Sequence, residues 1–201
     1  MDVYLLFKNQ CCLFVDFNAQ GFISKSKVVK VFTNLQDIIG VVTLNGELFV
    51  LKSENERKLE QIEVFDSETY LPKRCLTIED LKDPSSIAAC QRYNCLYVSD
   101  VELSAIHRVD LETNAASRWS VDARPSGLFV TQTSTLLVTL NSSGVIQEFT
   151  TRGEIVREVK LSHSFDLPLH AVELPSGNLV ASHAGLKEHS VCIVDREERI
   201  I

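Results

Sequence analysis

The chain has 201 residues, of which 45% are hydrophobic and 23% are charged. This balance is typical of a protein that can bury a sizeable core, and it excludes an intrinsically disordered chain. The formal net charge of −7 has the wrong sign for a protein that binds the phosphate backbone of nucleic acids. No run approaches the roughly 18 apolar residues that a membrane-spanning helix needs, so we expect neither a nucleic acid nor a membrane as a partner.

The first residues do not have the pattern of a secretory signal. Asp2 stands where such a signal would be basic, and the apolar run that follows it stops after five residues. An even number of cysteines would suggest a disulfide framework in a small secreted chain. Because no signal precedes them, we expect these cysteines to be reduced and buried, and the protein to be cytoplasmic. The cysteines are Cys11, Cys12, Cys75, Cys90, Cys95 and Cys192.

In chain order, the first predicted strands lie within residues 12–37. Leu13-Phe14-Val15-Asp16, the Gln20-Gly21 turn and the apolar run Val28–Phe32 predict part of a repeating unit. Further along, Asn55–Glu63 is the single plausible helix, but its position inside a repeat favours a loop.

From residue 38 onward the sequence repeats a pattern of four short strands. The second strands begin at Leu48, Leu96, Leu136 and Leu179, at spacings of 48, 40 and 43 residues. The third strands begin at Ile62, Ile106, Ile146 and Val191, at spacings of 44, 40 and 45 residues. The first strands are 38–42, 86–89, 127–130 and 171–174, and the fourth strands are 75–78, 117–121, 155–159 and 199–201.

Residues with special backbone preferences mark the ends of these strands. Pro84, Pro125 and Pro168 each stand just before a first strand. Asn45-Gly46 and Ser176-Gly177-Asn178 are predicted to join first to second strands, as tight hairpin turns that require positive φ.

Repeats of about 40 to 45 residues with four strands each are typical of β-propeller blades. The sequence therefore predicts an all-β protein, a β-propeller of four-stranded antiparallel blades. We expect a partial blade in 1–37 and four blades in approximately 38–83, 84–124, 125–167 and 168–201. The nearly apolar second strands should pack between blades, the third strands should have one solvated face, and Trp119 should pack between blades.

The segment DPSSIAACQRYNCLYVSDVELSAIHRVDLET, residues 83–113, resembles an NHL-type repeat. The resemblance rests on Pro84, on Val98-Ser99-Asp100, on Ile106 and on Asp110, and it extends more weakly over residues 38–201. Asp100 is the one good match for the aspartate after the second strand. The resemblance implies a ring of six blades and a recognition module like those of tripartite-motif ubiquitin ligases, although these 201 residues hold no RING or B-box.

A catalytic site is not evident from the sequence. The densest group of metal-ligating residues is His183, His189 and Cys192, but its spacing is unlike that of structural zinc sites, and we expect exposed loop histidines beside a buried cysteine. The sequence contains no Gly-rich phosphate loop, G-x-S-x-G elbow or paired CxxC. Six-bladed propellers also include calcium-dependent lactonases, and similarity to these would imply Asp100, Asn141 and Glu173 as metal ligands.

Without a catalytic set, the sequence favours a noncatalytic protein-interaction module of the NHL-like type, without a cofactor, and the alternative is a lactonase-like hydrolase. The loops between second and third strands, 52–59, 100–104, 141–144 and 183–189, should lie together on one face and bind a protein partner. The predicted binding residues are Lys52, Glu54, Arg57, Asp100, Glu102, Asn141, His183 and Lys187.

Overall fold

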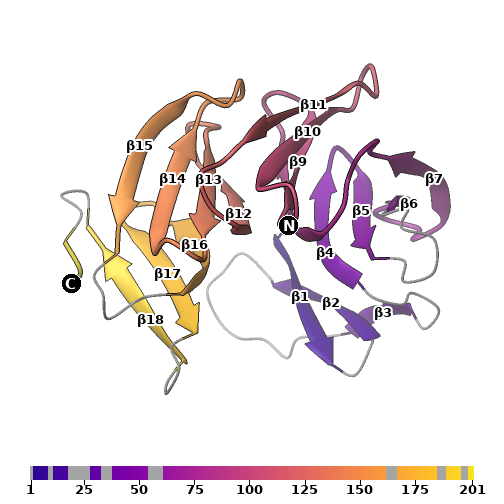
Figure 1. Ribbon diagram of the computed structural model, residues 1–201. Coiled ribbons are helices and arrows are strands. Elements are labelled where there is room, and N and C mark those ends of the chain that lie inside the picture. The colour runs from indigo at the N-terminus through magenta and orange to yellow at the C-terminus, as the bar shows by residue number, and fades with distance from the viewer. Residues whose placement is uncertain are drawn as a thin grey trace. The chain divides into compact units, whose positions relative to one another are not determined.

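The computed structural model describes residues 2–8, 11–17, 28–32, 38–53, 61–161, 167–184, 189–195 and 199–201, and it describes side chains from residue 38 onward, except those of Gln61 and His189. All regular structure in these residues is β-strand (Figure 1). The chain divides into two compact units, Met1–Thr77 and Ile78–Ile201. Among the described residues there is no helix with the length and apolar character that crossing a membrane requires.

The first unit contains two antiparallel sheets, each with its strands in chain order. Sheet 1 consists of β1 (Asp2–Lys8), β2 (Cys11–Phe17) and β3 (Val28–Phe32). Sheet 2 consists of β4 (Ile38–Leu44), β5 (Glu47–Lys52), β6 (Gln61–Asp66) and β7 (Pro72–Thr77). The sequence analysis found β2 and β3 but missed β1. Of the predicted helix-or-loop segment 55–63, residues 55–60 lie outside the described residues and the rest begins β6.

The second unit contains three antiparallel sheets, again in chain order. Sheet 3 consists of β8 (Pro84–Cys90), β9 (Cys95–Asp100), β10 (Ala105–Asp110) and β11 (Ala116–Ser120). Sheet 4 consists of β12 (Pro125–Val130), β13 (Leu136–Leu140), β14 (Val145–Phe149) and β15 (Ile155–Lys160). Sheet 5 consists of β16 (Pro168–Glu173), β17 (Leu179–Ala184) and β18 (His189–Val194). Its predicted fourth strand is reduced to one bridge between Val194 and Ile200.

The turns follow the local sequence chemistry. Asn45 and Gly46 both have positive φ, of 50° and 77°, as the two-residue hairpin turn between β4 and β5 requires. The third and fourth strands of sheets 2 and 3 are joined by the related sequences DSET and DLET. In the second of these, the Oδ1 atom of Asp110 accepts hydrogen bonds from the backbone N–H of Glu112 and from both the N–H and the hydroxyl of Thr113. Asp66 makes the same set of bonds in the first.

First strands of successive sheets lie side by side in the second unit, with β12 in contact with both β8 and β16. Each of these strands has a register shift just after its proline. The shift places serine hydroxyls against the next sheet: Ser85 donates to the carbonyl of Pro125 at 2.9 Å, and Ser126 donates to the carbonyl of Pro168 at 3.2 Å. Bulges of this kind redirect a side chain, and here they direct a hydroxyl across the sheet boundary.

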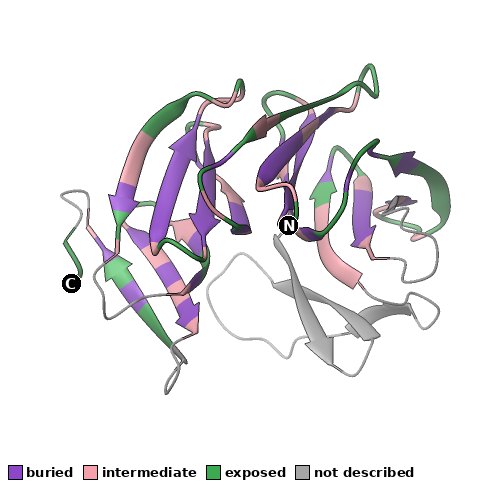
Figure 2. Cartoon of the chain, viewed as in Figure 1, coloured by how far each residue is buried: buried purple, intermediate pink, exposed green. Residues whose placement is uncertain are grey.

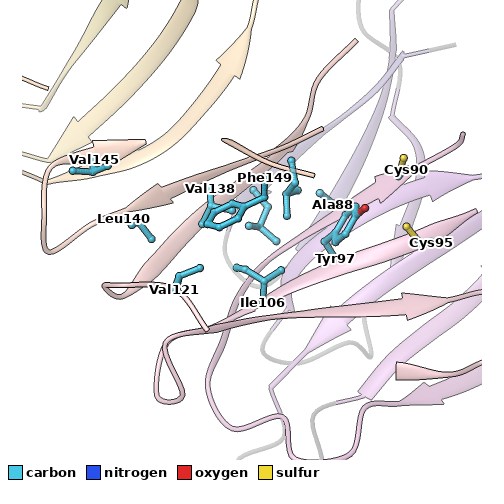
Figure 3. Close-up of a cluster of buried hydrophobic side chains, with 12 residues drawn as sticks. Ala88, Cys90, Cys95, Tyr97, Ile106, Val121, Val138, Leu140, Val145 and Phe149 are labelled. Atoms are coloured by element: carbon cyan, nitrogen blue, oxygen red, sulfur yellow. The ribbon is translucent and has the colours of Figure 1, made fainter. Parts of the chain in front are cut away.

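For each sheet of the second unit, we call the face toward the next sheet in chain order the front face and the opposite face the rear face. The front face of sheet 3, with Tyr97 and Ile106, packs on the rear face of sheet 4 in one apolar cluster (Figure 3). The partly buried Trp119 packs against this cluster. Trp119 lies 6.1 Å from the ring of Tyr97 and 6.1 Å from the ring of Phe149, measured between ring centroids. The predicted position of Trp119 between blades is confirmed. The front face of sheet 4 packs on the rear face of sheet 5 in the same way, around Leu137 and Ile146.

In sheets 2, 3 and 4 the fourth strands β7, β11 and β15 are the most exposed, with half or more of their residues exposed (Figure 2). The second strands β9 and β13 are buried throughout, as predicted. The prediction of a solvated face on the third strands is wrong for β14, which is also buried throughout. Its polar side chains remain paired inside: Glu148 accepts from Arg157 of β15 at 2.5 Å, and Gln147 donates to Glu158 of β15 at 2.9 Å.

The cysteines differ in their surroundings. Cys90, Cys95 and Cys192 are buried, which confirms the prediction for these three residues. Cys75 is exposed, and the prediction of burial is wrong there, because β7 is an outer strand with one residue buried out of six. The side chains of Cys11 and Cys12 lie outside the described residues.

Candidate binding surface

The turn between β9 and β10, residues 101–104, is fixed on both sides by backbone hydrogen bonds. The N–H of Val101 donates to the carbonyl of Asp83, in the connector that leads into sheet 3, at 2.8 Å. The N–H of Val121, in the connector that leaves the sheet, donates to the carbonyl of Ser104 at 2.8 Å. The turn and both connectors are therefore joined at one end of the sheet.

Sheet 4 repeats this arrangement. In its turn 141–144, the N–H of Asn141 donates to the carbonyl of Arg124 at 3.0 Å, and the carbonyl of Gly144 accepts from the N–H of Leu161 at 3.0 Å. We use the name connector edge for the turns 101–104 and 141–144 together with the connectors 79–83 and 121–124. Loops that bind partners are effective when a rigid scaffold positions them, and these hydrogen bonds supply that rigidity.

Asp100 organises the sheet 3 part of the connector edge from inside. Its carboxylate accepts hydrogen bonds from the backbone N–H groups of Lys82 at 2.8 Å, Leu103 at 3.0 Å and Asp83 at 3.3 Å. The Nε2 atom of His107 lies 3.3 Å from the same carboxylate. Asp100 is 0% exposed, so its predicted place on an exposed binding loop is wrong. It holds the turn and the connector together instead.

His107 has an environment that changes its ionisation. Burial lowers the pKa of its imidazole below the ordinary value of 6.5, with Arg118 acting in the same direction, while the carboxylates of Asp100 and Asp80 oppose the shift. The unfolded chain therefore binds a proton at His107 more readily than the folded chain does. The contribution of the neutral ring to stability is complete above the unfolded pKa and declines as the pH falls below it.

We accordingly expect the melting temperature to decrease between about pH 7 and pH 5, and the His107→Gln variant to show a smaller decrease over that interval. The measurement is a thermal melt followed by circular dichroism at several pH values. Hydrogen bonds from Thr113 lower the pKa of Asp110 below its ordinary value of 3.8. The stability that such carboxylates contribute is therefore lost only at a pH below that value, outside the interval measured. A profile for His107→Gln that parallels the wild type would contradict this assignment.

The structure places the other predicted binding residues in different positions, with different degrees of exposure. Glu102 is exposed in the turn of sheet 3. Asn141 is half-buried, with its Nδ2 atom 3.5 Å from the carbonyl of Pro168. Lys52 is half-buried in β5 and pairs with Glu63 at 2.5 Å. His183 is buried in β17 and hydrogen-bonds Ser190. The remaining predicted residues, Glu54, Arg57 and Lys187, lie outside the described residues.

Three of the residues that were predicted in exposed loops lie in strands instead, at one equivalent position. Lys52, Asp100 and His183 are the register partners of Ile38, Pro84 and Pro168, the first residues of their first strands. The second strands continue through these polar residues rather than ending before them. In the sequence, a polar residue after an apolar run indicated that the strand had ended. In the structure, each of these three side chains is buried or half-buried and has a partner on the neighbouring strand.

The ligand set of the lactonase alternative is not assembled. Asp100 and Asn141 lie at the connector edge, but Glu173 lies at the opposite end of its sheet, where it pairs in register with Leu179. Its carboxylate accepts a hydrogen bond from the N–H of Gln132 at 3.2 Å. Within the part of the chain that the structure describes, no group of three His, Cys, Asp or Glu side chains is placed to hold a metal ion.

The histidine-rich group also differs from its prediction. His183 is buried rather than exposed in a loop, because β17 extends to Ala184. Cys192 is buried as predicted, on the same face of sheet 5, while the side chain of His189 lies outside the described residues.

We expect calcium to leave the melting temperature unchanged. A central site filled at about 100 times its dissociation constant would stabilise the fold by about 2.7 kcal/mol, which is roughly 5 to 10 °C for a chain of this length. Differential scanning fluorimetry with and without millimolar calcium measures this directly. A saturable increase in melting temperature, absent with magnesium, would restore the lactonase alternative.

The exposed charges of the connector edge are mostly acidic. Its exposed charged side chains are five carboxylates against two cations, which gives a net charge of −3. These residues are Glu79, Asp80, Asp83, Glu102, Asp122, Lys82 and Arg124. Sequence analysis selected only Glu102 from this group. The acidic residues of TIEDLKD, residues 77–83, were a signal in the sequence that could have identified the first connector. That Asp122 adds its charge to the same edge could be known only from the fold.

No family model and no curated protein matches the sequence. Among solved structures, the chain is similar to virginiamycin B lyase from Staphylococcus aureus, with 12% identity and a TM-score of 0.66 over 99% of this chain and 68% of that one. It is similar to Kuenenia stuttgartiensis hydrazine synthase, with 21% identity and a TM-score of 0.68 over 92% of this chain and 51% of that one. It is also similar to the WD40 β-propeller domain of Doa1, with 9% identity and a TM-score of 0.64 over 96% of this chain and 63% of that one.

At these identities the likeness shows the fold alone. Together with the repeated antiparallel sheets, it confirms the prediction that the chain is an all-β protein with a β-propeller fold. The chain spans between about half and two thirds of the length of these solved chains. Propeller enzymes and WD40 propellers both occur among them, so the function must be argued from the surface of this chain.

Proposed function

We propose that this chain is a noncatalytic protein-interaction module that binds a basic protein surface through its connector edge. The observation that carries the proposal is the net charge of −3 on exposed side chains of an edge fixed by backbone hydrogen bonds. Ordered carboxylates on a rigid frame attract a basic partner and select its orientation without a large entropy cost on binding.

The internal use of Asp100 supports a binding role more than a catalytic one. Its oxygens are occupied by three backbone N–H groups and by His107, and the residue has no exposed surface on which a substrate could meet it. Glu102, two residues further along, has its carboxylate in solvent. Asp100 thus fixes the turn from inside, and Glu102 is left free to contact a partner.

The NHL-type repeat and a cytoplasmic location are retained as parts of this proposal. The WD40 propellers among the similar structures, including the RRP9 repeats at 14% identity and a TM-score of 0.65, support a propeller as the frame of such a module. Virginiamycin B lyase, also among them, is an enzyme. The choice therefore depends on the experiment that follows.

The test compares two double charge reversals of equal size. In the first, Asp83→Lys and Glu102→Lys change the connector edge. In the second, Glu112→Lys and Glu154→Lys change exposed residues in the turns between third and fourth strands of the same sheets. The wild type and both variants are immobilised, incubated with cell extract at about 0.15 M salt, and washed in steps to about 0.5 M, where charge attraction is strongly screened.

We expect the wild type and the Glu112/Glu154 variant to retain a common set of basic proteins, which the salt steps release. The Asp83/Glu102 variant should lose that set. Loss from both variants would mean that overall charge alone governs retention, and equal retention by all three would mean that the connector edge is not used. Either of these results would overturn the proposal.

A further inference from the structure

Polar side chains are buried among the apolar ones where the front face of sheet 3 meets the rear face of sheet 4, a contact that we call the sheet 3/4 boundary. In the part of the chain that the structure describes, four buried polar atoms at this boundary have no hydrogen-bond partner. Buried polar groups in folded proteins nearly always have one, so four exceptions at one boundary are unusual. They are the hydroxyl of Tyr97, the Nε atom of Arg108, the Nε1 atom of Trp119 and the Oε1 atom of Gln147.

The register places these side chains on the two faces that meet. Tyr97 belongs to the apolar cluster of this boundary, and Arg108 is directly opposite it on β10 (Figure 3). Trp119 packs against the same cluster, with its ring centroid 6.1 Å from that of Tyr97. Gln147 lies on the facing side of sheet 4, because it is opposite Val138, another member of the cluster.

Tyr97 and Gln147 are the most deeply buried of the four. Each is 1% exposed, so bulk solvent does not reach its polar atoms. The amide of Gln147 is also fixed in one orientation, because its Nε2 atom donates to Asp122 at 3.3 Å and to Glu158 at 2.9 Å. Reversing the amide would lose both bonds. The unpaired Oε1 atom is therefore a property of the boundary.

The contact between sheets 4 and 5 is different. Its buried Glu148 accepts hydrogen bonds from Thr135 and Arg157. Its buried His183 forms a hydrogen bond with Ser190. These two polar groups thus find partners within the chain, whereas the four atoms at the sheet 3/4 boundary need a partner from outside it.

The mixture of donors and acceptors decides what that partner is. The Nε atom of Arg108 and the Nε1 atom of Trp119 can only donate. The Oε1 atom of Gln147 can only accept, and the hydroxyl of Tyr97 can do either. An anion would leave Oε1 unpaired and would lie near the two carboxylates that hold the amide. A cation would meet the guanidinium of Arg108. Water both donates and accepts, and buried water typically bonds to groups of this kind.

We propose that ordered water binds at the sheet 3/4 boundary and completes the hydrogen bonds of these four side chains. Sheets 3 and 4 are then joined through water as well as through apolar contacts, because Tyr97 and Gln147 belong to opposite sides of the boundary. The proposal uses contacts within the second unit alone, and it does not depend on the proposed function.

The test measures long-lived internal water in a solution of the full chain by magnetic relaxation dispersion of the water nuclei. Tyr97→Phe removes only the hydroxyl, and the dispersion amplitude should fall by the contribution of about one water molecule. The urea midpoint should fall as well, because removing an unpaired buried hydroxyl would be neutral or stabilising. The matched control is Tyr93→Phe, which removes a hydroxyl from a residue that is 41% exposed and should change neither quantity.

An unchanged amplitude in Tyr97→Phe would overturn the proposal whatever the midpoint does, since no bound water would then depend on the hydroxyl. Equal losses in the two variants would also overturn it. A measurement on the wild type needs no substitution: Trp119 is the single tryptophan, so the indole N–H band in the Raman spectrum reports its hydrogen bonding alone. We expect a hydrogen-bonded N–H, and the band of a free N–H would count against the site.

Discussion

Replacing Asp100 with alanine is expected to lower the free energy of unfolding by about 3 kcal/mol or more. The substitution leaves buried N–H groups of the connector and the turn without their acceptor, and it removes the carboxylate beside His107. Trp119 is the single tryptophan of the chain and lies between sheets 3 and 4. Its fluorescence during urea unfolding therefore reports the loss directly.

The matched control is Asp110→Ala. Asp110 also accepts three hydrogen bonds, from Glu112 and Thr113, but it does so at the exposed turn at the other end of sheet 3. Water can replace those bonds, so the urea midpoint should move much less. Equal losses for the two variants would show that burial of Asp100 has no special importance, and the assigned role in the connector edge would then be wrong.

The second large effect is expected for Gly127→Ala, which should destabilise the chain by about 2 to 3 kcal/mol. Gly127 lies in β12 where that strand meets β16. A Cβ atom there would come within 2.6 Å of the carbonyl oxygen of Leu169 and within 2.7 Å of the Cα atom of His170. Both atoms belong to backbone, so the two first strands would have to separate.

Gly46→Ala provides the comparison. Gly46 has a φ of 77° and no atom within 4 Å of its added Cβ, so the cost there is backbone strain alone, about 1 kcal/mol. The order of the two losses, measured by urea unfolding followed by circular dichroism, tests whether close approach of β12 and β16 is needed. A larger loss for Gly46→Ala would contradict it.

Much of the fold could be predicted from local patterns because each sheet is formed by residues close together in sequence. Leu96, Leu136 and Leu179 recur at a nearly constant spacing, and each begins or lies next to the start of a second strand. Asn45-Gly46 forms the expected hairpin turn because its backbone preference is local. Trp119 could be placed between blades because so large an apolar side chain in an outer strand needs a neighbouring sheet to cover it.

The candidate site was predicted less well, since it depends on contacts between distant segments. Asp100 looked like the start of a loop, but two of its three backbone N–H donors come from residues 17 and 18 positions earlier in the chain. Glu173 was grouped with Asp100 because both fall near the ends of predicted strands, although hairpin geometry places them at opposite ends of their sheets.

The sequence by itself determined most of the strands, their turns and the four-strand repeat, because alternating burial and turn chemistry act within a few residues. Only the tertiary structure decided which polar residues face inward, since that depends on which strand or connector lies opposite. It also decided that acidic residues of separate connectors share one edge and that the first strands β8, β12 and β16 lie side by side. Both features arise from the stacking of sheets, and no local pattern in the sequence specifies them.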